Sequence, residues 1–466
     1  MRYFLLALIV VTVLVTGLWL VSRSLPASQA QREALALLET PPTFEGSNAF
    51  TALWLLPYDV PEAEHNAAMA ADIEAHVRNR TKPLEEQVAL LGHSLAAEQY
   101  ANLRPEAEDR DLFCRSGRGS CLDQVRADPD SVRSLVARHA RLLERIAALA
   151  DHDHVQILFP SDFFSPTPGF QLTSYIQTEH AIAFVDGRID DALEGTCRDL
   201  LTWQRLGTNT DTLLMRMVGQ SFAGKRYAEL LADMLAELPP GHPLPYNCQT
   251  LLRPPEPQAL NMCQSMRGEF ELLQAGLREI GSGFGPLVQP DEIPWSERLR
   301  LKAFRYEPSI ALAAPHYAQW CSDDIRDAVA ADNPDPELLE QSGLFNLRCL
   351  ANLYGCWLAG ISVPAFAPYH ARHLDHGARM RVLAAVLWLQ QHATEQSVEA
   401  AFVSLPEELR LPTRPLRLES EHARLSVELH HQSEGEYFTL PLPGSRRPGG
   451  LSGDSGRDNY SGTGAF

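Results

Sequence analysis

The sequence has little positive charge, and it lacks the compact motifs that usually mark a metal site. It contains 40 Lys and Arg residues against 59 Asp and Glu residues, so its formal net charge is −19 at pH 7. Such an acidic chain repels nucleic acid and anionic lipid headgroups, and we expect neither as its main ligand. No CxxC motif and no compact Cys/His cluster is present, so the spacing that zinc–thiolate sites need is missing. We therefore expect no nucleic-acid partner and no cofactor.

Charge and proline are also missing from residues 3–21, YFLLALIVVTVLVTGLWLV. At about 1.5 Å of helical rise per residue, this run spans roughly 29 Å, close to the hydrocarbon thickness of a bilayer. It therefore predicts a transmembrane helix, which makes the membrane an expected partner of residues 3–21. Cysteine is missing from the chain up to Cys114, so a lipid-modified N-terminus has no acceptor.

Flanking charge predicts how this helix is oriented. Arg2 and the amino terminus precede the run, whereas residues 22–31 add only Arg23. The slight excess of positive charge before the run favours a cytoplasmic N-terminus, a single pass through the inner membrane and a periplasmic body. A cleaved signal peptide is the alternative, because Ser28 and Ala30 are small residues of the kind that precede a cleavage site. The apolar run is longer than the core of about 7 to 15 residues in a signal peptide, which favours an uncleaved signal-anchor.

The sequence has eight cysteines, an even number that favours disulfides outside the reducing cytosol. Cys114 and Cys121 bracket RSGRGS, a glycine-containing turn that lets the two side chains meet. Closing so short a loop contributes about 2.5 kcal/mol through chain entropy. Cys248 and Cys263 flank the proline-rich stretch QTLLRPPEPQ, and a bond between them would staple this stretch for about 3 kcal/mol.

Cys349 and Cys356 are predicted not to bond with each other. They lie seven residues apart in an apolar helical pattern, which places them on one helix face about 10 Å apart. That separation is too long for a disulfide. Cys321 and Cys197 are the candidates to bond with them.

Helical periodicity runs through most of the chain after residue 30, so we predict a mainly α fold. Apolar residues recur at three- and four-residue spacing at Leu84, Val88, Leu91 and Leu95, for example. Consecutive antiparallel helices with short connections predict a stacked, solenoid-like body, although no fixed-period repeat is evident. Near the C-terminus, the stretches RPLRLES, ARLSVEL and EYFTLPL alternate apolar and polar residues, which predicts a small antiparallel β-meander.

Changes in composition divide the chain into segments. The predicted order is a transmembrane signal-anchor at 1–22, a linker and short helix at 23–40, a first helical region at 41–238, a proline-rich connector at 239–257, a second helical region at 258–405, the β-meander at 406–441 and a disordered tail at 442–466. One further helix is predicted within the second helical region, from Glu337 to Ala359.

Two short stretches match catalytic motifs without the surroundings that those motifs need. GDSG at 453–456 matches the segment around the nucleophile of trypsin-like proteases, but it lies in the predicted tail. GHSLA at 92–96 resembles the nucleophile elbow of lipases, which requires a strand before the serine and a helix after it. Residues 84–91 are helical by pattern, so Ser94 is not expected to act as a nucleophile.

Glu269 gives the sequence a partial resemblance to lytic transglycosylases. It precedes GPLVQP at 285–290 at about the distance that separates the catalytic glutamate of that family from a GLMQ-like segment. Phe270 stands where the family has serine, and proline and valine replace the leucine and methionine of that segment. The resemblance implies an alternative function, a cell-wall hydrolase with Glu269 as general acid, which a raised pKa in a cleft would support.

Histidines gather in two stretches, at 151–154 and at 370–376. His370, His373 and His376 lie on neighbouring faces of a predicted helix, so two or three of them could bind a metal. We favour a different interpretation, in which both stretches lie at helix ends and their histidines are exposed to solvent. No HExxH-type pattern supplies a general base beside the ligands.

A broader resemblance covers more of the chain. The apolar run, EGSNAF at 45–50, the close cysteine pair, DTLLMRMVGQSF at 211–222 and SLPEELRLP at 404–412 together resemble uncharacterised bacterial single-pass, membrane-anchored helical proteins. That resemblance implies no activity. We therefore predict a non-catalytic, membrane-tethered extracytoplasmic module for interaction or envelope assembly, with a protein partner in the cell envelope.

Overall fold

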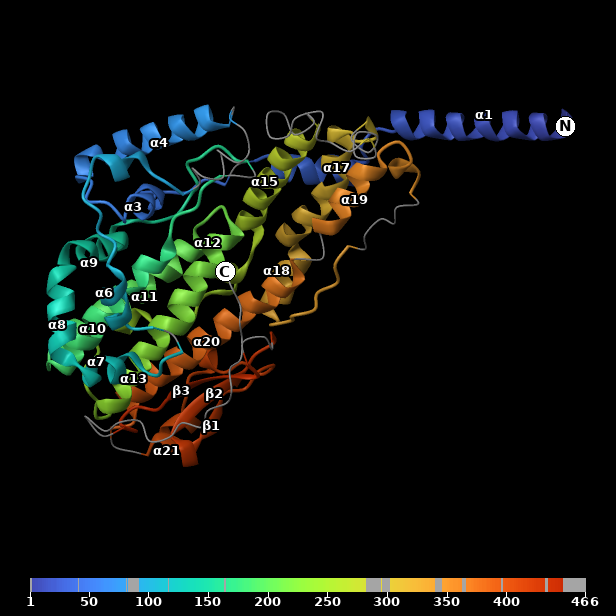
Figure 1. The fold of residues 1–466 in the computed structure, drawn as a ribbon. Helices are drawn as coiled ribbons and strands as arrows, with labels where there is room; N and C mark the ends of the chain where they lie inside the picture. Colours follow the sequence, from blue (N-terminus) through green and yellow to red (C-terminus); the bar gives the residue numbers. More distant parts are fainter. Residues whose placement is uncertain are drawn as a thin grey trace.

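Helices form most of the body, and one of them, α1 (Arg2–Ser24), extends away from it (Figure 1). The computed structural model describes residues 2–40, 42–80, 82, 92–115, 117–162, 165–281, 295, 302–339, 346–362, 366–394, 397–431 and 435–446. The predicted mainly α fold with a small C-terminal sheet is confirmed for these residues.

Helix α1 has the character expected of a membrane span. Residues 3–21 are all exposed, and the most apolar window has a mean hydropathy of 2.8. Among the residues that the structure describes, this is the single helix long and apolar enough to cross a bilayer. The chain then breaks at Pro26 and restarts at α2 (Gln29–Leu38), where Ser28 and Gln31 form a reciprocal capping box.

A smaller hydrophobic core lies next to the body end of α1, and we call it the proximal core. It is built from α2, α15 (Cys263–Gly281) and α17 (Tyr306–Ala318), with α19 (Leu353–Ser362) packed against α17. Met266, Phe270 and Tyr317 are almost fully buried in it. Helix α18 (Asp323–Ala330) adds Ile325 to the same core.

The larger hydrophobic core, the distal core, lies farther from α1. It contains α10 (Ile176–Val185), α11 (Ile189–Thr208), α12 (Leu213–Ser221), α13 (Ala228–Glu237) and α20 (Ala367–His392). Figure 1 shows α20 between these helices and the sheet. Glycines let α11 and α12 cross closely, since a Cβ at Gly219 would lie 2.5 Å from the Gly207 Cα.

Short helices cover the outside of the distal core and connect the larger elements. They are α3 (Phe50–Trp54), α4 (His65–Asn79), α6 (Ala107–Leu112), α7 (Cys121–Ala127), α8 (Pro129–Arg138), α9 (Ala140–Ala147), α14 (Tyr246–Thr250) and α21 (Val398–Val403).

The sheet is an antiparallel meander of β1 (Arg417–Glu419), β2 (Arg424–Glu428) and β3 (Tyr437–Pro441), in that order. Its alternating pattern places Leu425 and Leu440 opposite each other and buries both against the distal core. The predicted antiparallel pairing is confirmed.

Two helix predictions differ from the structure. The helix expected from residue 84 has its first part outside the described residues, and its described end, Leu95–Glu98, is a short 3-10 turn. The helix expected from Glu337 begins only at Leu353 and is preceded by a 3-10 turn at Leu347–Cys349. Apolar content alone predicted a continuous helix in the second case, but the described residues 337–339 and 346–352 are not α-helical. The tail from residue 447 onward lies outside the described residues.

Candidate functional site

The eight cysteines form four disulfide pairs, and three of the pairs differ from expectation. Cys114 and Cys121 are joined as predicted, with their Cα atoms 5.3 Å apart. Cys248 does not bond with Cys263, because α14 carries Cys248 onto α11, where Cys197 lies 5.1 Å away between Cα atoms. Cys263 begins α15 and bonds instead with Cys321.

Cys349 and Cys356 are bonded to each other, which corrects the prediction that they are not. Their Cα atoms are 5.7 Å apart instead of about 10 Å. The reason is local backbone geometry: Cys349 ends a 3-10 turn, and α19 starts four residues later, so the two cysteines do not share one helix. The bond closes a tight turn at the start of α19.

Glu269 lies on α15 and accepts a hydrogen bond from the backbone N–H of Leu213, at 2.9 Å. Burial raises the pKa of Glu269, although the hydrogen bond from Leu213 opposes the change. Burial also raises the pKa of nearby Asp211 to about 7, with Glu271 and Glu269 adding negative charge. The raised pKa agrees with the hydrolase alternative, but Glu269 caps the start of α12 and does not line the groove described below. The GPLVQP segment lies outside the described residues.

His370, His373 and His376 are buried within α20, which corrects the prediction that they are exposed at a helix end. Burial and the charge of Arg216 lower the pKa of His373, and burial with Arg379 and Arg216 lowers that of His376 to about 3. Neutral histidines beside arginines make a poor environment for a cation. Within the described ranges, no group of three or more His, Cys, Asp or Glu side chains is arranged to hold a metal.

The other catalytic resemblances find no support in the described residues. The Ser94 hydroxyl accepts a hydrogen bond from the Ala96 N–H and caps a 3-10 turn. The sheet described above has three strands and pairs only residues 417–441, so it supplies no strand before Ser94. Residues 453–456 lie outside the described part of the chain.

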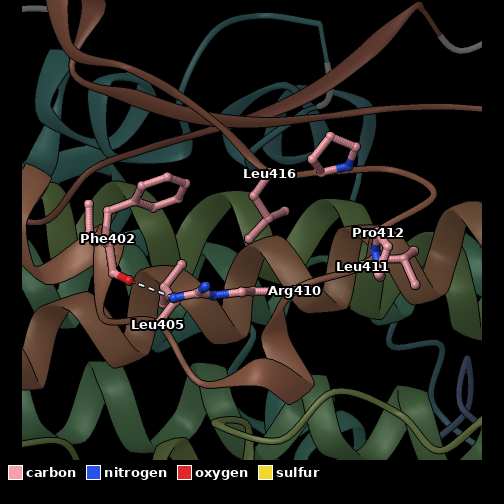
Figure 2. Close-up of a pocket in the computed structure, with 8 residues that line it drawn as sticks. Phe402, Leu405, Arg410, Leu411, Pro412 and Leu416 are labelled. Atoms are coloured by element: carbon pink, nitrogen blue, oxygen red, sulfur yellow. Dashed lines mark hydrogen bonds between the residues drawn. The ribbon is translucent and has the colours of Figure 1, made fainter.

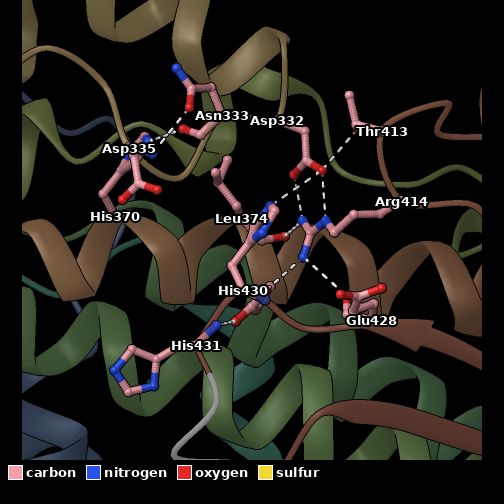
Figure 3. Close-up of polar contacts among 11 residues, drawn as sticks. Asp332, Asn333, Asp335, His370, Leu374, Thr413, Arg414, Glu428, His430 and His431 are labelled. Carbon is pink, nitrogen blue, oxygen red and sulfur yellow. Dashed lines mark hydrogen bonds and ion pairs between the residues drawn. The ribbon is translucent and has the colours of Figure 1, made fainter.

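The structure instead brings together a buried group of charges that sequence patterns did not reveal, centred on Arg414 (Figure 3). We call Arg414, Asp332, Asp375 and His430 the Arg414 cluster. The Arg414 guanidinium bonds both carboxylate oxygens of Asp332, and its Nη1 lies 2.6 Å from Asp375 Oδ1. It also donates to the Leu374 carbonyl, at 2.9 Å. Bidentate pairing of this kind fixes the orientation as well as the position of the arginine.

Hydrogen bonds complete the Arg414 cluster from the sheet side. The Asp375 carboxylate accepts the backbone N–H groups of His430 and His431, at 2.8 and 2.9 Å. Burial opposes ionisation of Asp332, but hydrogen bonds from His430 and Arg414 outweigh it and lower the pKa of Asp332. The cluster therefore ties the end of α18, the middle of α20 and the end of β2 into one rigid unit.

Arg414 lies in the chain between Pro412 and Pro415, two residues that line a surface groove (Figure 2). This distal groove has a volume of about 450 Å³ and is lined by Phe402, Val403, Leu405, Arg410, Leu411, Pro412, Pro415 and Leu416. Its lining is almost wholly apolar, and Arg410 donates a hydrogen bond to the Val403 carbonyl across it. The volume is within the range of about 300 to 1,000 Å³ that is usual for ligand pockets.

The Arg414 cluster has no counterpart among the motifs of the sequence, because its residues come from segments far apart in the chain. The distal groove is lined by one continuous stretch, residues 402–416, which overlaps the SLPEELRLP segment at 404–412. Comparisons with protein-family models, with curated proteins and with solved structures found no match to this chain.

Proposed function

We propose that the protein is a single-pass, non-catalytic interaction or envelope-assembly module, with its body on the periplasmic side of the inner membrane. The apolar α1, which is exposed over residues 3–21, supports the tether. Four disulfides support an oxidising compartment for the body. The flanking charge described above supports a cytoplasmic N-terminus.

The distal groove is the observation that carries this proposal. Its lining is almost wholly apolar, and the segment that supplies Pro412, Pro415 and Leu416 also carries Arg414, which is paired with Asp332 and Asp375. Figure 1 places α21 and the sheet at the end of the body opposite to α1. A site held there can bind an apolar segment of an envelope protein, and a membrane tether raises the effective concentration of that partner. A solenoid-like stacking of the helices would extend the binding surface further.

Site-specific photocrosslinking tests this proposal in the full chain within membranes. A photoreactive residue at Val403, which is 75 % exposed beside the groove, should give one protein adduct. Leu416→Glu should remove most of that adduct, because a carboxylate in the groove opposes apolar binding. The matched control is Tyr246, exposed but away from the groove, which should give no adduct.

Hydrolysis of purified peptidoglycan would contradict the proposal. The alternative, a cell-wall hydrolase of the lytic-transglycosylase type, is favoured by the raised pKa of Glu269. Activity that is lost in Glu269→Gln, in protein whose circular dichroism is unchanged, would establish the alternative. Circular dichroism is needed because Glu269 also caps α12.

A further inference from the structure

Residues 346–357 form a short segment of the body that contacts the end of α1. Ser22, in the last turn of α1, is buried and its hydroxyl accepts the backbone N–H of Ala351, at 2.9 Å. The Arg348 guanidinium donates to the Pro26 carbonyl just after α1. The Cys349–Cys356 disulfide holds this segment as a tight turn. Segment and helix end are thus fixed to each other, and Figure 1 shows α19 near the body end of α1.

This segment exposes large apolar side chains, although polar residues usually cover such a turn. Leu347, Leu350, Leu353 and Trp357 are 41, 36, 50 and 48 % exposed, and we call them the junction patch. Trp357 is held in place by stacking on Tyr354, with ring centroids 5.7 Å apart. Large apolar side chains exposed close together are typical of a surface that binds another protein or a membrane.

Helix α19 explains why the patch is apolar on its outer side. Its sequence, LYGCWLAGIS, contains no charged residue. Tyr354 and Leu358 pack against the proximal core, while Leu353 and Trp357, one turn apart, face outward. A helix that is apolar on both faces is typical of a protein interior or of a membrane.

The position of the patch relative to α1 identifies what covers it. Val21 is the last residue of the apolar run, and Ser22 follows it directly. A hydrogen bond from Ala351 to Ser22 therefore places Leu350 and Leu353 at the depth where the apolar run ends. For a membrane-spanning α1, that depth is the boundary between acyl chains and headgroups.

Cationic side chains surround the same place. Arg305 donates to the Arg23 carbonyl at 2.8 Å, so Arg23, Arg305 and Arg348 gather around the end of α1. Among the described residues, none of these three arginines lies within ion-pair distance of a carboxylate. In a chain with a net charge of −19, such a local group of arginines suits lipid phosphates. Tryptophan and arginine are also the residues that anchor proteins at membrane interfaces.

We propose that the junction patch lies in the interface of the bilayer beside α1, so that the body is held to the membrane at two places. This inference rests on the membrane-spanning α1 of the proposed function. The occupant of the patch is lipid, with acyl chains against Leu353 and Trp357 and phosphates near the arginines. A second copy of the chain on the patch would be a different outcome of the test.

Quenching of tryptophan emission by brominated lipids tests the proposal on the full chain. The protein is reconstituted in vesicles of phosphatidylethanolamine and phosphatidylglycerol that carry bromine either near the headgroup or near the end of the acyl chain. Trp357 should be quenched more by the shallow bromine. Trp357→Phe keeps an aromatic ring against Tyr354 and should lose the quenched emission of Trp357. Because the chain has seven tryptophans, this loss should be about one seventh of the total tryptophan emission.

Two further variants separate this inference from the anchor itself. Trp388→Phe, on α20 in the distal core, should lose only emission that bromine does not quench. Trp19→Phe should lose quenched emission whenever α1 crosses the bilayer. Quenching that depends on Trp19 but not on Trp357 overturns the junction patch alone. Quenching that depends on neither overturns the anchor as well, and an unquenched Trp357 with a crosslinked dimer assigns the patch to a second copy.

Discussion

The distal and proximal cores of this protein bury their apolar residues alike but treat their surfaces differently. In the distal region, the Arg414 guanidinium is enclosed between two buried carboxylates. In the proximal region, Arg305 and Arg348 donate to backbone carbonyls at the end of α1, and leucines and a tryptophan face outward. The distal region thus pairs its buried arginine with carboxylates, whereas the proximal region leaves arginines and large apolar side chains at its surface.

Removal of the Arg414 charge should have the largest effect on this comparison. Arg414→Met leaves Asp332 and Asp375 buried without their cation, which is expected to lower the free energy of unfolding by about 3 to 5 kcal/mol. The midpoint of urea unfolding, followed by circular dichroism on the full chain in detergent, measures this loss. Arg417→Met is the matched control, because Arg417 forms an exposed pair with Glu428 and should cost less than about 1 kcal/mol. Equal effects of the two variants would contradict the structural role of the cluster.

The disulfides should divide in the same way, with the distal bond contributing more. Cys197–Cys248 closes a loop with a separation of 51 residues, worth about 4 kcal/mol of chain entropy, whereas Cys349–Cys356 closes seven residues for about 2.5 kcal/mol. Replacing both cysteines of each pair by alanine and measuring urea midpoints gives the two values. A larger loss from the Cys349–Cys356 pair would show that this turn has a role beyond loop closure.

Two buried groups, His376 and Asp211, should contribute to the pH dependence of the free energy of unfolding with opposite signs. His376 has a folded-state pKa of about 3 against 6.5 unfolded, so the unfolded chain binds more protons and stability falls as pH drops below about 6.5. As pH falls from 7 to 5, His376 should lower the free energy of unfolding by about 2 kcal/mol. Asp211 has a folded-state pKa of about 7 against 3.8 in the unfolded chain, so the folded protein binds more protons. As pH falls from 7 to 5, Asp211 should therefore raise the free energy of unfolding by about 2 kcal/mol.

Single variants should separate these opposing contributions. Asp211→Asn should leave a chain that loses stability between pH 7 and 5, because His376 and His373 still resist protonation. His376→Gln should shift the slope in the opposite direction. Urea midpoints measured at pH 7, 6 and 5 give both slopes, and parallel profiles for the two variants would contradict the assigned pKa shifts.

Local signals in the sequence predicted some parts of this structure and missed others. The apolar run of α1, the Cys114–Cys121 turn and the alternation of the C-terminal strands each need only neighbouring residues, and each is present. The Arg414 cluster joins residues 39 and 82 positions apart, so no local pattern contains it.

Errors arose where a local pattern had two physical meanings. The sequence places His373 and His376 at a helix end and therefore in solvent, but α20 continues past them to His392 and buries both. The apolar stretch around Cys349 was read as helix, although it is a turn whose exposed leucines suit a bilayer. Side chains that face lipid and side chains buried in a protein are both apolar, so a sequence pattern alone does not distinguish them.

The link between α1 and α2 determines how far the protein can reach. Only residues 25–28 separate the two helices, and four extended residues span at most about 14 Å. The capping box at Ser28 and the hydrogen bond from Arg348 to Pro26 shorten that span further. If α1 spans the membrane as proposed, this short link keeps the body close to the bilayer, and the length of the folded body sets how far the distal groove lies from it. A partner of the proposed module would then have to present its binding segment at that distance from the membrane.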